Sequence, residues 1–336
     1  MASEPAPLAT RSRSLVAWFA RHARTFPWRE NRTPYRVWIA ETMLQQTRAA
    51  TVVPYFETWM TRFPDLEALA QAPRSDVLAT WQGLGYYRRA RALHEAAVHL
   101  VRDHGGTFPT TETGWRALPG IGSYTAAAIL AFAQGERTLA IDGNVRRVAA
   151  RLLAHPAPKD AEIREALLPL LPRRQPERGT EALIELGATV CTPRQPRCPA
   201  CPLAPACQAH QQDAVLAYPA PRARRTPPTR NRYALVHLRD DEILLERRPD
   251  EGLLGGLWGF PQTETLPTGR ALPALRHAYT HFTLHLTPIV TPETPSALTD
   301  ATRWTPVHQL ESLPLSNVDR RVLDLLDQEG LLASTS

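Results

Sequence analysis

The sequence lacks any long apolar segment. It contains no run of about 18 apolar residues, roughly the length that crosses a bilayer. Residues 1–14 have no apolar core of the kind that a secretory signal requires, and we expect them to form a disordered tail. These absences predict an intracellular, cytoplasmic protein without a membrane-spanning helix.

Cysteine is scarce and confined to one short segment. The 336 residues include only four cysteines, Cys191, Cys198, Cys201 and Cys207, separated by six, two and five residues. This crowding indicates metal ligands in a reducing compartment and not a disulfide framework. Zinc sites usually pair their ligands as two close couples, whereas only one couple is close here, so a single loop around a [4Fe–4S] cluster is favoured over zinc.

The remaining composition is that of a basic protein with enough apolar residues to form cores. The net charge is +6 and the hydrophobic content 43%. A basic balance suits a polyanionic partner without proving one. A chain of this length suggests about two domains.

The residue pattern divides the chain into a helical part and an α+β part. Helical periodicity begins near residue 15, and Thr33 followed by Pro34 is typical of a helix start. We therefore assign 15–207 to an all-α region that includes the cysteine loop 191–207, and the Pro- and Arg-rich stretch 208–230 to a linker. Residues 231–332 alternate as strands do, with helices expected near 268–277 and from about 317.

The segment Leu118–Asn144 carries the most informative motif. Gly120 and Gly122 form a Pro-Gly-Ile-Gly turn before an Ala-rich helix, so their backbone can approach a ligand closely. Free N–H groups at the start of that helix favour a phosphate, which is the helix-hairpin-helix pattern. An ordinary interhelical turn is the alternative. Asp142 precedes another helix, and taken by itself it is better explained as an N-cap.

Two further segments contain polar or aromatic residues beside apolar ones. Glu41 lies on the predicted helix after Pro34, away from the main apolar stripe but next to Val37 and Leu44. A solvated glutamate is the alternative. In GLGYYRRAR (Gly83–Arg91), aromatic residues beside arginines after a glycine bend suit base stacking and phosphate contact, or else buried tyrosines and a solvated basic face.

Together these motifs resemble a known superfamily. The hairpin, the aspartate about twenty residues after it and the C-x6-C-x2-C-x5-C loop resemble the endonuclease III superfamily of DNA glycosylases. Four motifs are similar to those of the MutY family, adenine DNA glycosylases that act opposite 8-oxoguanine. They are AETMLQQT (Ala40–Thr47), GLGYYRRAR, IDGNVRR (Ile141–Arg147) and ALIELGA (Ala182–Ala188).

The resemblance implies a helix-hairpin-helix glycosylase domain with a [4Fe–4S] loop, followed by an α+β Nudix-like domain. It implies a monofunctional adenine glycosylase of base excision repair that acts at the nucleoid as a monomer on duplex DNA containing A:8-oxoG or A:G. In bifunctional relatives a lysine after the hairpin attacks the sugar. Tyr124 occupies that position and supplies no amine.

The resemblance also implies residue roles. Glu41 would be the general acid, with a pKa raised by desolvation, and Asp142 would stabilise the sugar cation, kept ionised by the helix dipole. Tyr124 and Asn144 would orient these groups, and Glu185 would orient the base or Glu41, unless it is a helix-surface charge. The other residues assigned to DNA contact are Arg29, Gln46, Leu84, Tyr86, Gly120 and Gly122.

The C-terminal part resembles a Nudix domain that has lost its catalytic helix. GLLGGLWGFP matches the start of such a domain, but no Glu-rich, metal-binding helix follows, so we expect binding without hydrolysis. A Phe-Ser-His loop reads 8-oxoguanine in the family. Tyr279, Thr280 and His281 stand there, and we assign Thr280 and His281 to base contact. His277, His281 and His285 are expected to share one face of a strand, with a metal stripe as the alternative.

Three other functions are weighed against this one. A related glycosylase could remove another mismatched base, such as thymine. A non-catalytic iron–sulfur protein that binds DNA or senses redox state would need neither Glu41 nor Asp142. A Nudix pyrophosphatase with an attached DNA module would need the missing acidic helix.

Overall fold

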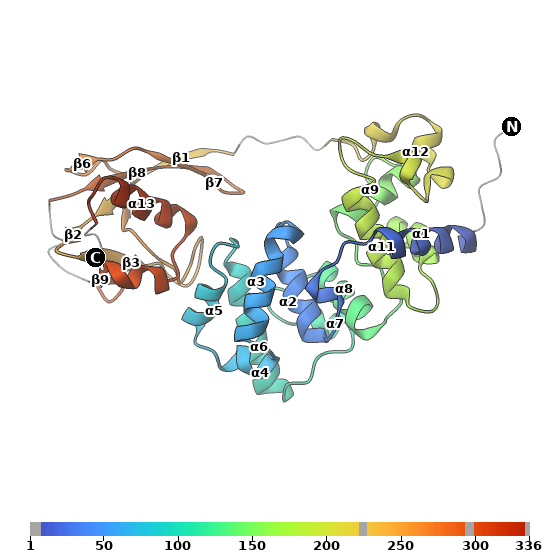
Figure 1. Cartoon of the computed structure of the whole chain (residues 1–336), viewed down its shortest axis with the longest axis horizontal. Coiled ribbons are helices and arrows are strands. Elements are labelled where there is room, and N and C mark those ends of the chain that lie inside the picture. Colours follow the sequence, from blue (N-terminus) through green and yellow to red (C-terminus); the bar gives the residue numbers. More distant parts are fainter. Residues whose placement is uncertain (1–7, 222–226, 293–298, 333–336) are drawn as a thin grey trace. The chain divides into compact units, whose positions relative to one another are not determined.

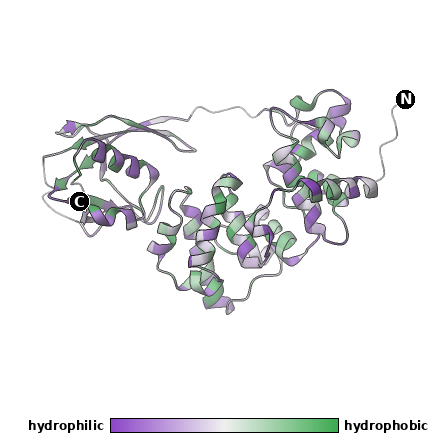
Figure 2. Cartoon of the chain, in the orientation of Figure 1, coloured by the Kyte–Doolittle hydropathy of each residue, from purple (hydrophilic) through white to green (hydrophobic). Residues whose placement is uncertain are grey.

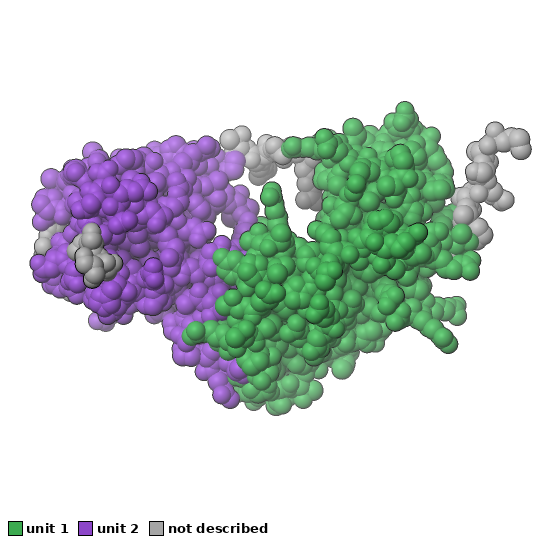
Figure 3. Space-filling view, viewed as in Figure 1, with its two compact units in different colours: residues 1–67, 95–223 green, residues 68–94, 224–336 purple. Residues whose placement is uncertain are grey.

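The computed structural model describes residues 8–221, 227–292 and 299–332. The chain forms two compact units, coloured separately in Figure 3. Unit 1 comprises Met1–Glu67 and Glu95–Ala223, and unit 2 comprises Ala68–His94 and Arg224–Ser336. The second unit therefore includes a segment from the middle of the helical region, which the sequence analysis placed wholly with the glycosylase part.

Unit 1 is helical, as the sequence predicts (Figure 1). Its α-helices are α1 (Leu8–His22), α2 (Pro34–Leu44), α3 (Ala49–Arg62), α7 (Glu112–Arg116), α8 (Ser123–Gln134), α9 (Gly143–Leu152), α10 (Asp160–Leu167), α11 (Pro176–Thr189) and α12 (Gln208–Gln211). Helices α4 (Leu66–Gln71) and α6 (Arg88–His104) each contribute residues to both units, and α5 (Arg74–Thr80) belongs to unit 2. No helix of the described residues is long and apolar enough to cross a membrane.

Local sequence explains where several helices begin. The Thr33 side chain accepts a hydrogen bond from the Arg36 N–H, and Pro34 occupies the first turn, where its missing N–H costs nothing. Gly135 ends α8 in the left-handed conformation, with φ of 69°. The start of α2 matches the prediction from Thr33 and Pro34.

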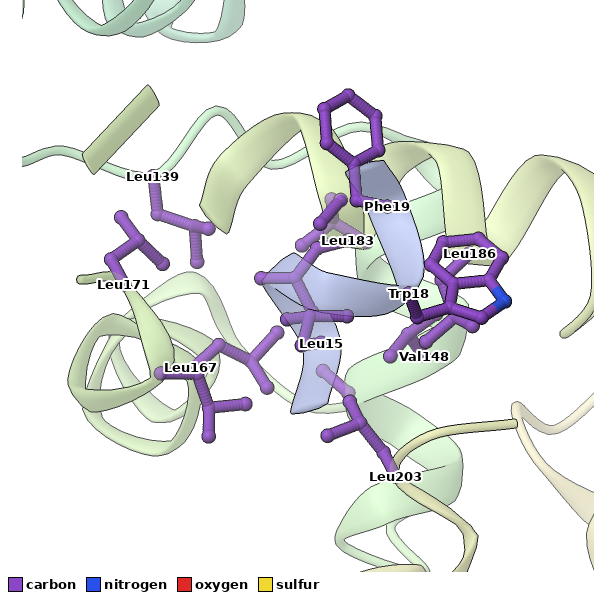
Figure 4. Packing of buried hydrophobic residues seen from close by; sticks show 14 of the residues in the cluster. Leu15, Trp18, Phe19, Leu139, Val148, Leu167, Leu171, Leu183, Leu186 and Leu203 are labelled. Atoms are coloured by element: carbon purple, nitrogen blue, oxygen red, sulfur yellow. The ribbon is translucent and has the colours of Figure 1, made fainter. Parts of the chain in front are cut away.

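The main core of unit 1 joins the first helix to α9, α11 and the cysteine segment. Figure 4 shows Leu15, Trp18 and Phe19 of α1 beside Leu183 and Leu186 of α11. Leu203, which lies between two of the cysteines, is 2% exposed and belongs to the same cluster. The cysteine segment is therefore anchored by apolar burial even before any metal is considered.

Unit 2 is built on two sheets. Its strands are β1 (Thr229–Val236), β2 (Leu238–Arg239), β3 (Glu242–Arg247), β4 (Trp258–Gly259), β5 (Gln262–Thr263), β6 (Arg270–Ala271), β7 (Leu275–Ala278), β8 (Thr283–Val290) and β9 (Thr302–Pro306). One sheet has the order β5-β1-β8-β6 with β7 also on β8, and the other has the order β2-β3-β4 with β9 also on β3. Strands β1 and β8 run parallel, with Tyr233 opposite Thr287.

The core of unit 2 includes residues from both sheets and from α13 (Asn317–Gln328), the predicted C-terminal helix. Val318, Val322 and Leu326 of α13 are fully or almost fully buried in it. Figure 2 shows that this helix carries both hydrophilic and hydrophobic residues, as expected for a helix with one buried face.

Hydrogen bonds tie the segment 68–94 to the rest of unit 2. The Tyr87 hydroxyl donates to the Leu315 carbonyl at 3.2 Å. A guanidinium N–H of Arg91 donates to the Gly255 carbonyl, and another to the Gly252 carbonyl at 3.5 Å. These partners are distant in sequence, so local patterns could not have revealed them.

Two predicted boundaries and one predicted helix are wrong. The tail predicted over 1–14 is helical from Leu8, and residues 1–7 lie outside the described residues. The predicted linker 208–230 starts with α12 and a 3-10 turn at Val215–Ala217, because Ala209 is fully buried. The helix expected over 268–277 is replaced by β6 and β7, because both pair with β8.

Substituting Gly187 tests how closely α11 and α9 pack. A Cβ at Gly187 would lie 2.5 Å from the Asn144 Cβ, whereas a Cβ at Gly143 would meet nothing within 4 Å. We expect Gly187→Ala to destabilise the protein by about 1–3 kcal/mol through overpacking, and Gly143→Ala to cause no loss. The midpoint of thermal unfolding is measured for both variants, and equal midpoints would contradict the close approach of α11 to α9.

Candidate active site

Unit 1 contains a cavity of about 860 Å³, within the range of roughly 300–1,000 Å³ that is usual for ligand sites. The structure brings seven of the predicted site residues to its lining. They are Arg29, Glu41, Gln46, Tyr124, Asp142, Asn144 and Glu185. They come from the segment before α2, from α2 and the turn after it, from α8, from α9 and its N-cap, and from α11, so five separate stretches of sequence form one pocket.

Glu41 is a buried carboxyl group. It is 6% exposed, and the Tyr124 hydroxyl donates to its Oε2 at 2.8 Å. Burial raises the pKa of Glu41 to about 7, and the hydrogen bond from Tyr124 opposes this rise. Asp142 also raises the pKa and Arg29 lowers it. The predicted desolvation of Glu41 is therefore present, and the solvated alternative is wrong.

Asp142 is the N-cap of α9, as the sequence predicts. Its Oδ1 accepts from the N–H groups of Asn144 and Val145 at 2.8 and 2.7 Å, and its Oδ2 accepts from the Asn144 side chain at 2.7 Å. These bonds lower the pKa of Asp142, but burial outweighs them and raises it. The sequence analysis expected the helix N-terminus to keep Asp142 ionised. The N–H groups of that terminus do favour the anion, whereas burial, which the sequence did not reveal, acts against it.

Arg147 connects this carboxylate to the cysteine segment. It donates to the Asn144 side-chain oxygen at 2.8 Å, to the Gly187 carbonyl at 2.7 Å and to the Cys191 carbonyl at 2.7 Å. Asn144 in turn holds Asp142. The orientation of Asp142 therefore depends on α11 and on the first cysteine as well as on its own helix.

Two glutamates on one face of α11 hold a cluster of arginines beside the pocket. Glu185 has no exposed surface, and it pairs with Arg24 at 2.6 Å and with Arg29 at 3.0 Å. Glu181 pairs with Arg32 at 3.0 Å and with Arg29 at 3.3 Å. Glu185 is thus not a surface charge, and it is positioned to fix Arg29.

Sequence reasoning missed Arg24, Arg32, Glu181 and Arg147 as parts of this site. The spacing of four residues between Glu181 and Glu185 places both carboxylates on one helix face and could have indicated a shared partner. The arginines carried no comparable signal, because their partners are far away in the sequence.

Gln46 lines the same pocket from the turn after α2. Its φ is +58°, in the left-handed region, which residues other than glycine rarely adopt. Such strain tends to occur at functional sites. The geometry is consistent with the predicted placement of this side chain at the pocket, while its contact with DNA stays a prediction.

The hairpin has the geometry that close backbone approach requires. Gly120 has φ of +74°, and Gly122 is the N-cap of α8. Both glycines are exposed, and Ile121 between them is buried. A Cβ at Gly122 would meet nothing within 4 Å, so the start of α8 is open to a ligand.

The predicted residues Tyr86, Leu84, Thr280 and His281 belong to unit 2. Tyr86 is 44% exposed, whereas Leu84 is only 6% exposed and does not project from the surface. The Tyr86 hydroxyl lies 3.1 Å from the Thr280 Oγ1, at hydrogen-bonding distance. Thr280 and His281 are exposed in the turn between β7 and β8.

The three histidines do not share one strand face. His277 is on β7, His281 is in the turn and His285 is on β8, where its backbone lies opposite Arg276 of β7. His277 is half-buried and His285 is exposed, so they point to opposite sides of the sheet. In the described part of the chain, no group of three or more His, Cys, Asp or Glu side chains could hold a single metal ion.

The four cysteines form no disulfide with one another and line a second, small cavity. Burial, together with the other three cysteines, raises the pKa of Cys201 to about 12. The Arg151 guanidinium donates to the Cys191 Sγ at 3.3 Å. Four thiols without a carboxylate are a donor set that suits an iron–sulfur cluster, which spreads its ligands over several metal atoms.

Replacing Glu41 by glutamine is expected to stabilise the protein above pH 7. Folding raises the pKa of this carboxyl from 4.5 to about 7, so its contribution to stability is complete below pH 4.5 and is lost as the pH rises through 7. Glutamine cannot ionise, so the variant should exceed wild type by at most about 3 kcal/mol at high pH. Urea unfolding measures this gain, and an equal gain near pH 4 would contradict the raised pKa.

Two family models match the chain. The model of the HhH-GPD superfamily base excision DNA repair proteins matches residues 39–173. The NUDIX domain model matches residues 232–325. The first match covers α8, the hairpin, Glu41 and Asp142, and the second covers almost all strands of unit 2.

Relatives are similar over most of the chain. It is 35% identical over 325 residues to an adenine DNA glycosylase of Rattus norvegicus, covering 80% of this chain and 63% of that protein. It is 36% identical over 315 residues to the adenine DNA glycosylase of Homo sapiens, covering 76% and 58%. The chain thus spans about three fifths of the length of these relatives.

Solved structures show the same helical fold. A thermostable thymine-DNA glycosylase is 26% identical with a TM-score of 0.58, covering 61% of this chain and 97% of that one. A non-covalent complex of endonuclease III with DNA is 21% identical with a TM-score of 0.52, covering 62% and 98%, and shows the fold alone. Residues 39–173 therefore belong to the HhH-GPD superfamily of base excision DNA repair proteins, a NUDIX domain follows at residues 232–325, and over most of its length the chain is similar to adenine DNA glycosylases.

Proposed function

We propose that this protein removes adenine from duplex DNA in which the adenine is paired with 8-oxoguanine or guanine, and that it leaves an abasic site. One observation carries the proposal: the buried Glu41, with a pKa of about 7, and the half-buried Asp142 line the same pocket. Two relatives that are 35% and 36% identical over most of the chain bear the name adenine DNA glycosylase.

The chemistry needs a better leaving group and a stabilised sugar cation. With a pKa near 7, Glu41 is protonated in a large share of molecules at neutral pH, so it can donate a proton to N7 of an extruded adenine. Release of the protonated base then leaves positive charge on the sugar. The ionised Glu41 can next accept a proton from the attacking water.

Asp142 supports the cation that forms on the sugar. Its carboxylate is held by three hydrogen bonds and is partly shielded from water. A desolvated, fixed anion interacts more strongly with a nearby developing cation than a hydrated one does. The same geometry permits a transient ester between Asp142 and the sugar.

We infer that the reaction proceeds without strand cleavage. Cleavage through a Schiff base requires an amine nucleophile. Tyr124 stands where the bifunctional relatives carry a lysine, and its hydroxyl is occupied by the hydrogen bond to Glu41. No lysine is among the described residues that line the pocket.

The exposed hairpin and the exposed Tyr86 side chain suit the binding of DNA from which one base is flipped out of the duplex. Exposed N–H groups at the start of α8 can hold a phosphate. An exposed aromatic side chain such as Tyr86 can fill the gap that an extruded nucleotide leaves in the duplex. In unit 2, Thr280 and His281 offer hydrogen-bonding groups to 8-oxoguanine, while the acidic helix needed for Nudix hydrolysis is missing from the sequence.

We also propose that Cys191, Cys198, Cys201 and Cys207 hold a [4Fe–4S] cluster. The cluster would cross-link the cysteine segment, which Leu203 already joins to the core of unit 1. When it is bound, the group supplies a rigid, electron-rich centre that can also exchange an electron. The cysteine residues would then fix the Cys191 carbonyl that Arg147 contacts.

Base release from defined duplexes tests the proposed function. We expect single-turnover release of adenine opposite 8-oxoguanine and guanine, with strand scission only after alkali treatment. Glu41→Gln should retain DNA binding and lose release by at least about 100-fold, since it cannot donate the proton. Release of thymine instead would assign the chain to another mismatch, and normal turnover by the variant would reject Glu41 as the acid.

Iron analysis tests the cluster. Cys198→Ser should lose iron and the visible absorbance near roughly 400 nm that iron–sulfur clusters give, because a serine hydroxyl is a much poorer ligand than a thiolate. Wild-type protein provides the matched reference. Zinc in place of iron, or unchanged absorbance in the variant, would contradict the proposal.

A further inference from the structure

Arg89 is a buried arginine directly behind an exposed tyrosine. It lies in the first turn of α6, and only 6% of its surface is exposed. Its guanidinium carbon lies 5.3 Å from the centre of the Tyr86 ring and 5.1 Å from that of Trp81. The cation therefore lies against both rings, an arrangement that stabilises the position of each.

The same guanidinium holds the backbone of the preceding loop. One N–H group of Arg89 donates to the Gly85 carbonyl at 3.1 Å and to the Leu84 carbonyl at 3.4 Å. The Trp81 indole N–H donates to the same Gly85 carbonyl at 3.0 Å. The loop before Tyr86 is thus fixed by two side chains from unit 2.

This fixation matters because the loop has an unfavourable backbone. Gly83 and Gly85 have φ of 93° and 74°, and Tyr86 itself has φ of 51°. Glycine adopts such angles freely, whereas a tyrosine needs supporting contacts to remain there. The supporting contacts at Gly85 come from Arg89 and Trp81, and the tyrosine hydroxyl is held by Thr280.

We propose that Arg89 is the positioning residue that holds the Tyr86 ring in the orientation that enters the duplex. This inference rests on the proposed function, since it gives Tyr86 a task on DNA. Arg89 acts through Tyr86 and does not itself contact nucleic acid. Its burial distinguishes Arg89 from the neighbouring Arg88, which is exposed and can contact a phosphate.

A double-mutant cycle tests the proposal on the full chain with duplexes that contain A opposite 8-oxoguanine. We expect Arg89→Met to lower the single-turnover rate of base release by about tenfold, since the stacked cation and two hydrogen bonds are lost. Combined with Tyr86→Ala, it should add little to the loss that Tyr86→Ala causes alone. Arg89→Lys keeps the charge and should recover part of the rate.

The matched control is Arg88→Met, which removes the same charge from the adjacent residue. Its effect should add to that of Tyr86→Ala. In a plot of the logarithm of DNA affinity against the logarithm of salt concentration, the slope should become less steep by about 1 for Arg88→Met, because a phosphate contact is lost. The slope should not change for Arg89→Met.

The possible outcomes separate the positioning role of Arg89 from the proposed function of the protein. Additive effects of Arg89→Met and Tyr86→Ala, or a reduced salt slope for Arg89→Met, would overturn the positioning role. If Arg89→Met does not fold, the same cycle with Arg89→Lys decides by the same criterion. Failure of the wild-type protein to release any base would instead reject the proposed function.

Discussion

A carboxylic acid kept out of water is the feature on which the pocket of this protein depends. Glu41 is held among apolar groups, and burial alone would make it a very weak acid. The Tyr124 hydroxyl and the charge of Arg29 oppose that effect and leave the pKa near 7. Arg29 is itself paired with two glutamates of α11, which limits how far its charge can ionise Glu41.

The second carboxylate is fixed by the interface between α9 and α11. Gly187 leaves no room for a side chain beside Asn144, and Asn144 holds Asp142 by two hydrogen bonds. Arg147 extends the same chain of contacts to the Cys191 carbonyl. A change in the cysteine segment would therefore reach the pocket through packed atoms and hydrogen bonds, without any large movement of the helices.

Local signals in the sequence predicted much of this arrangement. Thr33 and Asp142 begin helices as their side chains suggest, and both Glu41 and Asp142 line one pocket. Features that depend on distant partners escaped prediction. The stretch 268–277 forms strands because β8 pairs with it, residues 68–94 join unit 2, and Glu185 is buried only because two arginines neutralise it.

The pH dependence of base release under single-turnover conditions shows whether Glu41 acts in its protonated form. If Glu41 must be protonated, the wild-type rate should fall as the pH rises through about 7. Tyr124→Phe removes a hydrogen bond that lowers the pKa of Glu41, so its rate should fall only at higher pH. Identical profiles for the two proteins, or a wild-type rate that rises through this range, would contradict the account.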